Sequence, residues 1–184
     1  MSTNLLEIVQ KQMGYPPLQK IDPNTEAIKT NNSAPDERKF SQATIPCILI
    51  ALYKYSRTDA GAVNILRGTD SADWLSMIFG DNKKSVIQKI TDYSSYSKES
   101  ARIKMNRIAL NAVSNIKKKL REEATIHGVK KLLADQSPNI LLYLPADLQM
   151  GKMLNDDTLD DRTHKMEGPL SSLVQTIGVQ FSDD

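Results

Sequence analysis

Cysteine, histidine and aromatic residues are scarce in this sequence of 184 residues. It contains one cysteine, two histidines and one tryptophan, and aromatic residues make up 5% of the chain. A single cysteine excludes an internal disulfide framework, and no His/Cys/Asp cluster has the spacing of a zinc site. Cys47 lies in the apolar run from Ile45 to Tyr53, so we expect a buried, unreactive thiol.

Sequence motifs of the common enzyme classes are also missing. The chain has no glycine-rich phosphate-binding loop and no nucleophile elbow. The aspartates between Asp156 and Asp161, with His164, could loosely hold a divalent cation, but the glycine and terminal glutamate of an EF-hand are absent. A solvated acidic loop is the favoured interpretation. We therefore predict a protein that is not an enzyme and that carries no cofactor or metal ion.

Long hydrophobic runs are absent as well. The longest, Ile45 to Tyr53, falls far short of the roughly 20 residues that span a bilayer. Met1 to Asn4 contain no cationic segment, and Glu7 and Lys11 interrupt the following apolar stretch, so we expect no signal peptide. These features favour a cytoplasmic protein without a membrane span.

The formal net charge of +2 conceals an uneven distribution. Residues 82–134 carry thirteen basic and four acidic side chains, whereas residues 135–184 carry three basic and nine acidic ones. A solvated basic surface beside an acidic tail, which either folds back on it or keeps the protein soluble, explains this pattern most simply. A surface for nucleic acid is the alternative, although strong binders usually show a larger overall excess.

Ser97 to Leu120 form the longest stretch with one unbroken pattern, and we expect this helix to be the centre of the fold. Ser97 is a suitable N-cap, and the lysines of the last turns suit the helix dipole. The apolar face repeats at helical spacing and comprises Met105, Ile108, Ala109, Ala112, Ile116 and Leu120. The opposite face comprises Lys104, Arg107, Asn111, Ser114, Lys118 and Arg121.

Capping residues and periodicity predict the other helices. A helix opening at Ser33 should kink near Thr44 because Pro46 removes a backbone bond, and a β-strand is the alternative for Cys47 to Tyr53. Asp70 or Ser71 should cap a helix whose apolar side, including Trp74, faces the core. The remaining predicted helices are Thr3–Met13, a short one from Asp22, Ala60–Leu66, Asn82–Tyr93, Thr125–Ala134, Ile140–Leu144 capped by Ser137-Pro138-Asn139, and one or two turns within Ala146–Leu154.

The fold class that follows is all-α, because no strand alternation persists anywhere. We predict a single-domain irregular bundle of roughly seven to nine helices around a long central helix. Residues 1–154 form the helical domain, and residues 155–168 form an acidic mobile loop. Residues 169–184 form a C-terminal amphipathic segment and tail. Its apolar side chains either dock on the domain or bind a partner groove, and they are Leu170, Leu173, Val174 and Ile177.

The order of motifs in residues 72–150 resembles the YidB-like helical domains, a bacterial family of unknown function. Three stretches carry the resemblance: Trp74 to Asn82, Val86-Ile87 with the turn Ser94 to Ser97, and Gly128 to Leu148. The sequence departs from the family where Ser95 and Asp147 stand in place of glycine. The resemblance implies an all-helical domain and supplies no catalytic motif.

Two functions remain open at this point. The first is a non-enzymatic interaction or scaffold protein whose partner is another protein. The second is a nucleic-acid-associated protein that uses a basic helix face, with Tyr96 as the aromatic ring beside the cations. The candidate contact residues for either partner are Lys104, Arg107, Lys118, Arg121 and Tyr96.

Overall fold

The computed structural model describes residues 4–21, 36–68, 72–121 and 124–156. Every regular element in these ranges is helical, which confirms the all-α single domain and shows that the strand alternative for Cys47 to Tyr53 is wrong. The predicted helix from Asp22 and the C-terminal segment 169–184 lie outside the described residues. The helices are α1 (Leu5–Gln12), α3 (Asp36–Ser56), α4 (Asp59–Arg67), α5 (Trp74–Phe79), α6 (Lys83–Ser94), α7 (Lys98–Leu120), α8 (Ile126–Leu141) and α9 (Met150–Leu154), with the 3-10 turns η1 (Gly80–Asn82) and η3 (Ala146–Leu148).

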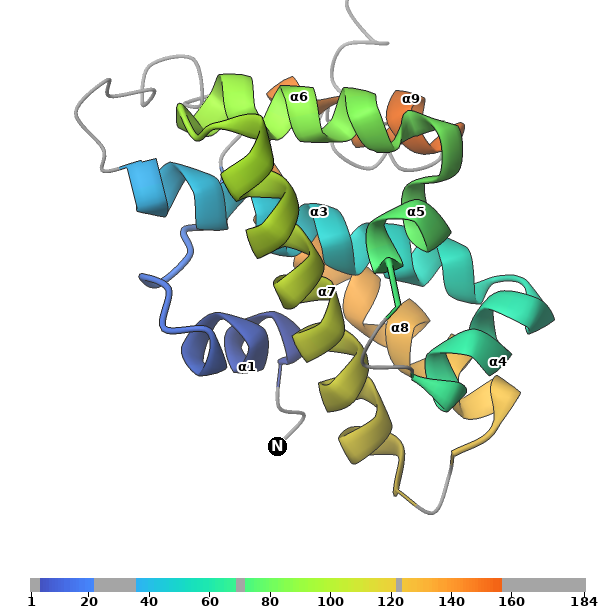
Figure 1. Cartoon of the computed structure of the whole chain (residues 1–184). Coiled ribbons are helices and arrows are strands. Elements are labelled where there is room, and N and C mark those ends of the chain that lie inside the picture. The colour runs from blue at the N-terminus through green and yellow to red at the C-terminus, as the bar shows by residue number, and fades with distance from the viewer. Residues whose placement is uncertain (1–3, 22–35, 69–71, 122–123, 157–184) are drawn as a thin grey trace, which may run out of the picture.

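A long central helix is present, but it is α3 and not the stretch from Ser97 to Leu120. All thirteen residues from Phe40 to Leu52 are buried. Helix α3 packs against α1, α4, α5, α6, α7, α8 and α9, and it runs through the middle of the bundle (Figure 1). The physical reason lies in its sequence, since Phe40 to Leu52 contain no charged residue and are mostly apolar, and such a stretch is stable only when other elements surround it.

Helix α7 crosses the front of α3 (Figure 1), and residues of its outer face such as Arg107 and Lys118 are exposed. The Ser97 hydroxyl accepts from the Ser100 N–H at 3.3 Å, which confirms the predicted cap. Its apolar face is buried as expected, from Met105 through Ile116 to Leu120. The helix therefore combines a core face with a charged outer face, and the functional candidates lie on the latter.

Two predicted helix boundaries are wrong, and the separate helix predicted for Ile140–Leu144 is not found, because residues 137–141 belong to α8. Asp73, and not Asp70 or Ser71, caps α5, because its Oδ1 accepts from the Ser76 N–H at 3.2 Å. Helix α8 does not end at Ala134 but continues through Pro138 to Leu141. Pro138 has no N–H for the Ala134 carbonyl, and the Ser137 hydroxyl donates to that carbonyl instead, at 3.1 Å.

Asp156, which lies past the predicted boundary at residue 154, packs onto the helical body. The Asp156 carboxylate is buried and lies 2.6 Å from the Arg57 guanidinium. The Asp156 N–H donates to the Gly151 carbonyl at 2.8 Å. This acidic residue therefore belongs to the helical body, and the rest of the predicted acidic loop lies outside the described residues.

Candidate functional site

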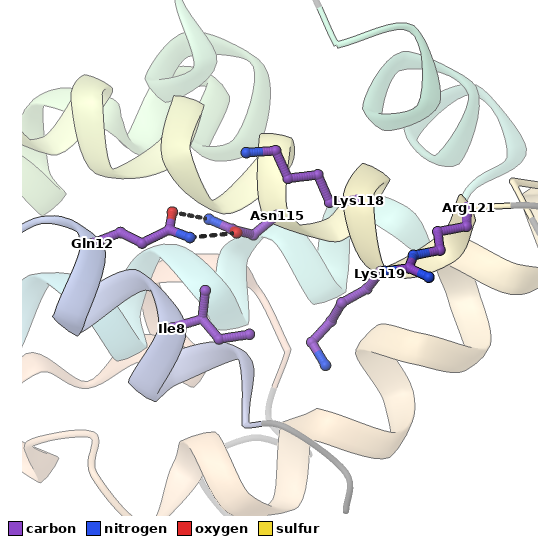
Figure 2. Close-up of a pocket in the computed structure, with 6 residues that line it drawn as sticks. All are labelled: Ile8, Gln12, Asn115, Lys118, Lys119 and Arg121. Atoms are coloured by element: carbon purple, nitrogen blue, oxygen red, sulfur yellow. Dashed lines mark hydrogen bonds between the residues drawn. The ribbon is translucent and has the colours of Figure 1, made fainter.

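An open hollow of about 570 Å³ lies between α1 and the C-terminal half of α7, and we call it the α1–α7 hollow. Figure 2 shows its lining, which mixes cations and amides and contains one aliphatic side chain. The lining residues are Ile8, Gln12, Asn115, Lys118, Lys119 and Arg121.

Local helix geometry and two long-range contacts place these side chains together. Residues three and four positions apart share a helix face, so Asn115, Lys118 and Lys119 emerge from neighbouring parts of the α7 surface. Helix α1 is held in place at its N-terminus. The backbone N–H groups of its first turn have no partner within the helix, and side chains accept from two of them. The Gln136 Oε1 on α8 accepts from the Leu5 N–H at 3.0 Å, and the Asn4 Oδ1 accepts from the Leu6 N–H at 3.1 Å.

A network of side-chain amides joins the two helices at one end of the hollow. The Asn115 Nδ2 donates to the Gln12 Oε1 at 2.8 Å, and the Gln12 Nε2 donates back to the Asn115 Oδ1 at 3.1 Å (Figure 2). The Asn111 Nδ2 donates to the same Gln12 oxygen at 3.1 Å. Asn115 is buried, so these bonds satisfy polar atoms that would otherwise be costly. The amides fix the spacing between α1 and α7. They are uncharged, so the charge of the hollow comes from its other lining residues.

The charges that line the α1–α7 hollow are all positive. Lys118 and Arg121 are exposed and Lys119 is half-buried, and Lys118 and Lys119 leave α7 in different directions (Figure 2). Among the residues that the structure describes, no acidic side chain lines the hollow. Within the described ranges, none of the three cations forms an ion pair, whereas Arg57, Lys83, Arg102 and Lys130 each do. The arrangement favours an anionic ligand that supplies the missing negative charge.

Only two of the basic residues predicted from the sequence meet in this hollow. Lys118 and Arg121 line it, whereas Lys104 and Arg107 lie nearer the start of α7 and do not. Sequence reasoning missed four lining residues: Ile8, Gln12, Asn115 and Lys119. Lys119 follows Asn115 by four residues, so helical spacing indicates that the two share a face of α7. Nothing in the sequence places Ile8 and Gln12 beside them, because their position depends on how α1 docks.

Tyr96 belongs to an aromatic cluster of the core. Its ring centroid lies 4.7 Å from that of Phe40, which in turn lies 6.2 Å from that of Tyr15. Lys104 Nζ lies 5.0 Å from the Tyr96 centroid, a cation–π contact. Burial, followed by the nearby Tyr96, raises the pKa of Tyr15 to about 12. The Tyr96 ring is thus engaged in packing, and Lys104 is engaged with the ring.

A second, smaller hollow of about 260 Å³ lies on another side of α7, and we call it the Trp74 hollow. Trp74 is 1% exposed, which confirms its predicted core position. Its indole Nε1 is buried and has no hydrogen-bond partner among the described residues. The lining residues are Gly68, Trp74, Leu110, Val113, Ser114, Lys117 and Lys118.

Metal-binding and nucleophilic chemistry find little support in the part of the chain that the structure describes. There, no group of three or more His, Cys, Asp or Glu residues is arranged to hold a metal ion. Cys47 is fully buried, as expected, and burial raises the pKa of its thiol well above the ordinary value. Its Sγ lies 3.4 Å from the Met150 Sδ. A thiol in this position is not a reactive group.

Among the described helices, none combines the length and apolarity needed to cross a lipid bilayer. The predicted partner-binding side chains of the C-terminal segment, from Leu170 to Ile177, lie outside the described residues. Comparisons with protein-family models, with curated proteins and with solved structures found no significant match to this chain.

Proposed function

We propose that the protein is a non-enzymatic helical interaction protein that binds an acidic segment of a partner protein in the α1–α7 hollow. One observation carries the proposal: Lys118, Lys119 and Arg121 line an open hollow to which the described residues contribute no acidic side chain. A partner that brings carboxylates would gain charge-assisted hydrogen bonds there, which are roughly twice as strong as neutral ones.

The chemistry of the hollow favours a protein segment over nucleic acid. Ile8 contributes an apolar surface that an aliphatic side chain of a peptide can cover. Single-stranded nucleic acid is usually held by exposed aromatic rings beside cations, and the Tyr96 ring is packed against Phe40. A segment that alternates acidic and aliphatic residues matches both parts of the lining.

A basic helix face for nucleic acid is the second candidate. It is favoured by the exposed Arg107 on the same helix as Lys118 and Arg121. A phosphate backbone can be followed by such a row of cations without any aromatic contact. The two candidates differ in their use of Ile8. An acidic peptide gains an apolar contact with Ile8, whereas a nucleic acid bound through its phosphates needs none.

Fluorescence anisotropy with a labelled peptide of alternating glutamate and leucine tests the proposal directly. The test variant replaces Lys118, Lys119 and Arg121 by glutamine. The matched control also removes three exposed charges, at Lys20, Lys84 and Lys98, which do not line the hollow. Each exposed ion pair contributes about 0.2–1 kcal/mol, so the test variant should bind roughly 3- to 100-fold more weakly, and the control should retain nearly full affinity.

Three further measurements separate the candidates. Ile8→Ser should weaken peptide binding and leave any nucleic-acid binding unchanged. The binding of a labelled single-stranded oligonucleotide and of a labelled duplex is measured in the same way. If either binds more tightly than the peptide and loses affinity linearly with the logarithm of salt concentration, the nucleic-acid candidate replaces the proposal. Equal loss of peptide binding in test and control variants would also contradict it.

The C-terminal segment remains a second predicted partner-binding element. Its side chains Leu170, Leu173, Val174 and Ile177 have the spacing of an amphipathic helix that fits a groove. Deleting residues 169–184 should leave peptide binding at the α1–α7 hollow unchanged and abolish a distinct interaction. The resemblance to the bacterial YidB-like domains and a cytoplasmic location likewise stay predictions, consistent with a non-catalytic helical binder.

A further inference from the structure

The Trp74 hollow is smaller than the α1–α7 hollow, and three of its lining residues are apolar: Trp74, Leu110 and Val113. Trp74 and Val113 are nearly fully buried, and Leu110 is half-buried. Its volume of about 260 Å³ lies just below the roughly 300–1,000 Å³ of most ligand pockets. The hollow therefore suits the apolar body of a small molecule rather than a segment of protein.

Two ammonium groups belong to the lining of this hollow, and one of them is held in place. Lys117 Nζ donates to the Arg67 carbonyl at 3.0 Å. The Lys117 side chain passes close over Gly68, where a Cβ would lie 2.7 Å from the Lys117 Cδ. A larger residue at position 68 would therefore displace the flexible end of this lysine. An ammonium has three donors, so two remain for a ligand.

Neither ammonium is neutralised within the described part of the chain. The ion pairs found there do not include Lys117 or Lys118. Ser114 adds an exposed hydroxyl that can donate or accept. The polar groups therefore favour an anionic head group next to an apolar body.

We infer that the Trp74 hollow is a binding site for a small organic carboxylate, with its apolar body against Trp74, Leu110 and Val113 and its carboxylate on Lys117. A carboxylate fits better than a phosphate ester, because the lining offers no arginine fork and no cradle of backbone N–H groups, the features that phosphate sites typically use. This site is additional to the proposed protein-binding hollow and does not depend on it.

The Trp74 indole offers a further reason for a ligand with an acceptor. A buried N–H without a partner is unfavourable, and Nε1 of Trp74 has none among the described residues. A ligand oxygen can reach it only if a neighbouring side chain shifts, since the nitrogen is covered. The inference rests on the hollow and its lysine, and contact with Nε1 would strengthen binding.

The unique tryptophan makes the test specific. The chain has one indole, so a 1H–15N correlation spectrum contains a single indole N–H signal, and the tryptophan fluorescence comes from Trp74 alone. Hexanoate is the probe, acetate supplies the same head group without the apolar body, and 1-hexanol supplies the apolar body without the charge. For a ligand of this size, a Kd on the order of 1 mM is expected.

The expected result is a saturable shift of the indole signal with hexanoate, with acetate binding at least roughly tenfold more weakly and 1-hexanol roughly two- to fivefold more weakly. Lys117→Gln should lower the affinity for hexanoate about two- to fivefold. Ser114→Leu should fill the hollow and block hexanoate binding while Lys117 and Lys118 remain. Lys119→Gln is the matched control, because Lys119 lines only the other hollow.

The inference is overturned if the indole signal does not shift at hexanoate concentrations well above the expected Kd. It is also overturned if acetate matches hexanoate, or if Ser114→Leu and Lys119→Gln behave alike. Lys119→Gln should weaken only the binding of the acidic peptide, and Lys117→Gln only the binding of hexanoate. A failure of the proposal for one hollow is therefore distinguishable from a failure of the proposal for the other.

Discussion

Replacing Gln42 by methionine should destabilise the domain more than any sequence pattern suggests. Gln42 is buried in the central helix α3, and its amide holds two other segments of the chain. Its Nε2 donates to the Gln19 carbonyl at 3.0 Å and to the Tyr143 carbonyl at 2.7 Å. Its Oε1 accepts from the Gln19 N–H at 2.9 Å. One side chain thus joins the segment after α1 to the end of α8.

The magnitude follows from these three bonds. A typical intramolecular hydrogen bond contributes about 0.5–1.5 kcal/mol net, and a buried group left without a partner costs more. Methionine is similar to glutamine in shape, so Gln42→Met removes the bonds and keeps most of the packing. We expect a loss of about 3 kcal/mol in the free energy of unfolding, which for a chain of this size lowers the Tm by about 6–12 °C.

Urea unfolding monitored by circular dichroism measures the loss, and amide hydrogen exchange at Gln19 reports on the local bond. Gln88→Met is the matched control, because the Gln88 amide bonds only the exposed Asp92, and it should change stability by less than about 0.5 kcal/mol. If Gln42→Met also stays within about 0.5 kcal/mol of the unaltered protein, water replaces the amide and the reasoning is refuted.

Three further predictions concern single side chains. Thr44→Val should stabilise the domain by about 1 kcal/mol in urea unfolding, because the buried Thr44 hydroxyl has no hydrogen-bond partner; a loss of stability would show a missed partner. Ser95→Gly should add about 0.5–1 kcal/mol, measured by thermal unfolding, since Ser95 caps α6 with φ 61°; Ser85→Gly, inside α6, is the control and should destabilise. The Lys83 hydrogen bond, with Ser76, lowers the pKa of the half-exposed Asp73 to about 2, so its stabilisation is present above about pH 4 and lost as the pH falls toward 2. Asp73→Asn should flatten this part of the stability–pH curve, and an unchanged slope would contradict the assignment.

Much of the local structure could be predicted from the residues alone. Ser97 as a helix cap and the apolar face of α7 follow from rules that act within one or two turns of a helix. Cys47 and Trp74 were placed in the core because their neighbours are apolar. These features depend on residues close in sequence, so tertiary packing reinforces them and does not change them.

The candidate site could be predicted only in part. Lys118 and Arg121 share a face of α7 by helical spacing, and they remain on the same hollow in the structure. Lys104 has the same helical spacing and was predicted on the same face of α7, yet its ammonium lies over the Tyr96 ring. The difference comes from the aromatic packing of Tyr96 on Phe40, a residue of α3 that periodicity within α7 cannot reveal.

The sequence by itself determined that the chain folds as helices and which faces of those helices are apolar, because backbone propensity and capping are local. Only the tertiary structure decided that α3, with its long uncharged middle, takes the centre, and that α1 docks beside the last turns of α7 to form the hollow. It also decided that Asp156 joins the folded body through Arg57. These outcomes depend on how the helices exclude water from one another, a property of the whole assembly rather than of any single segment.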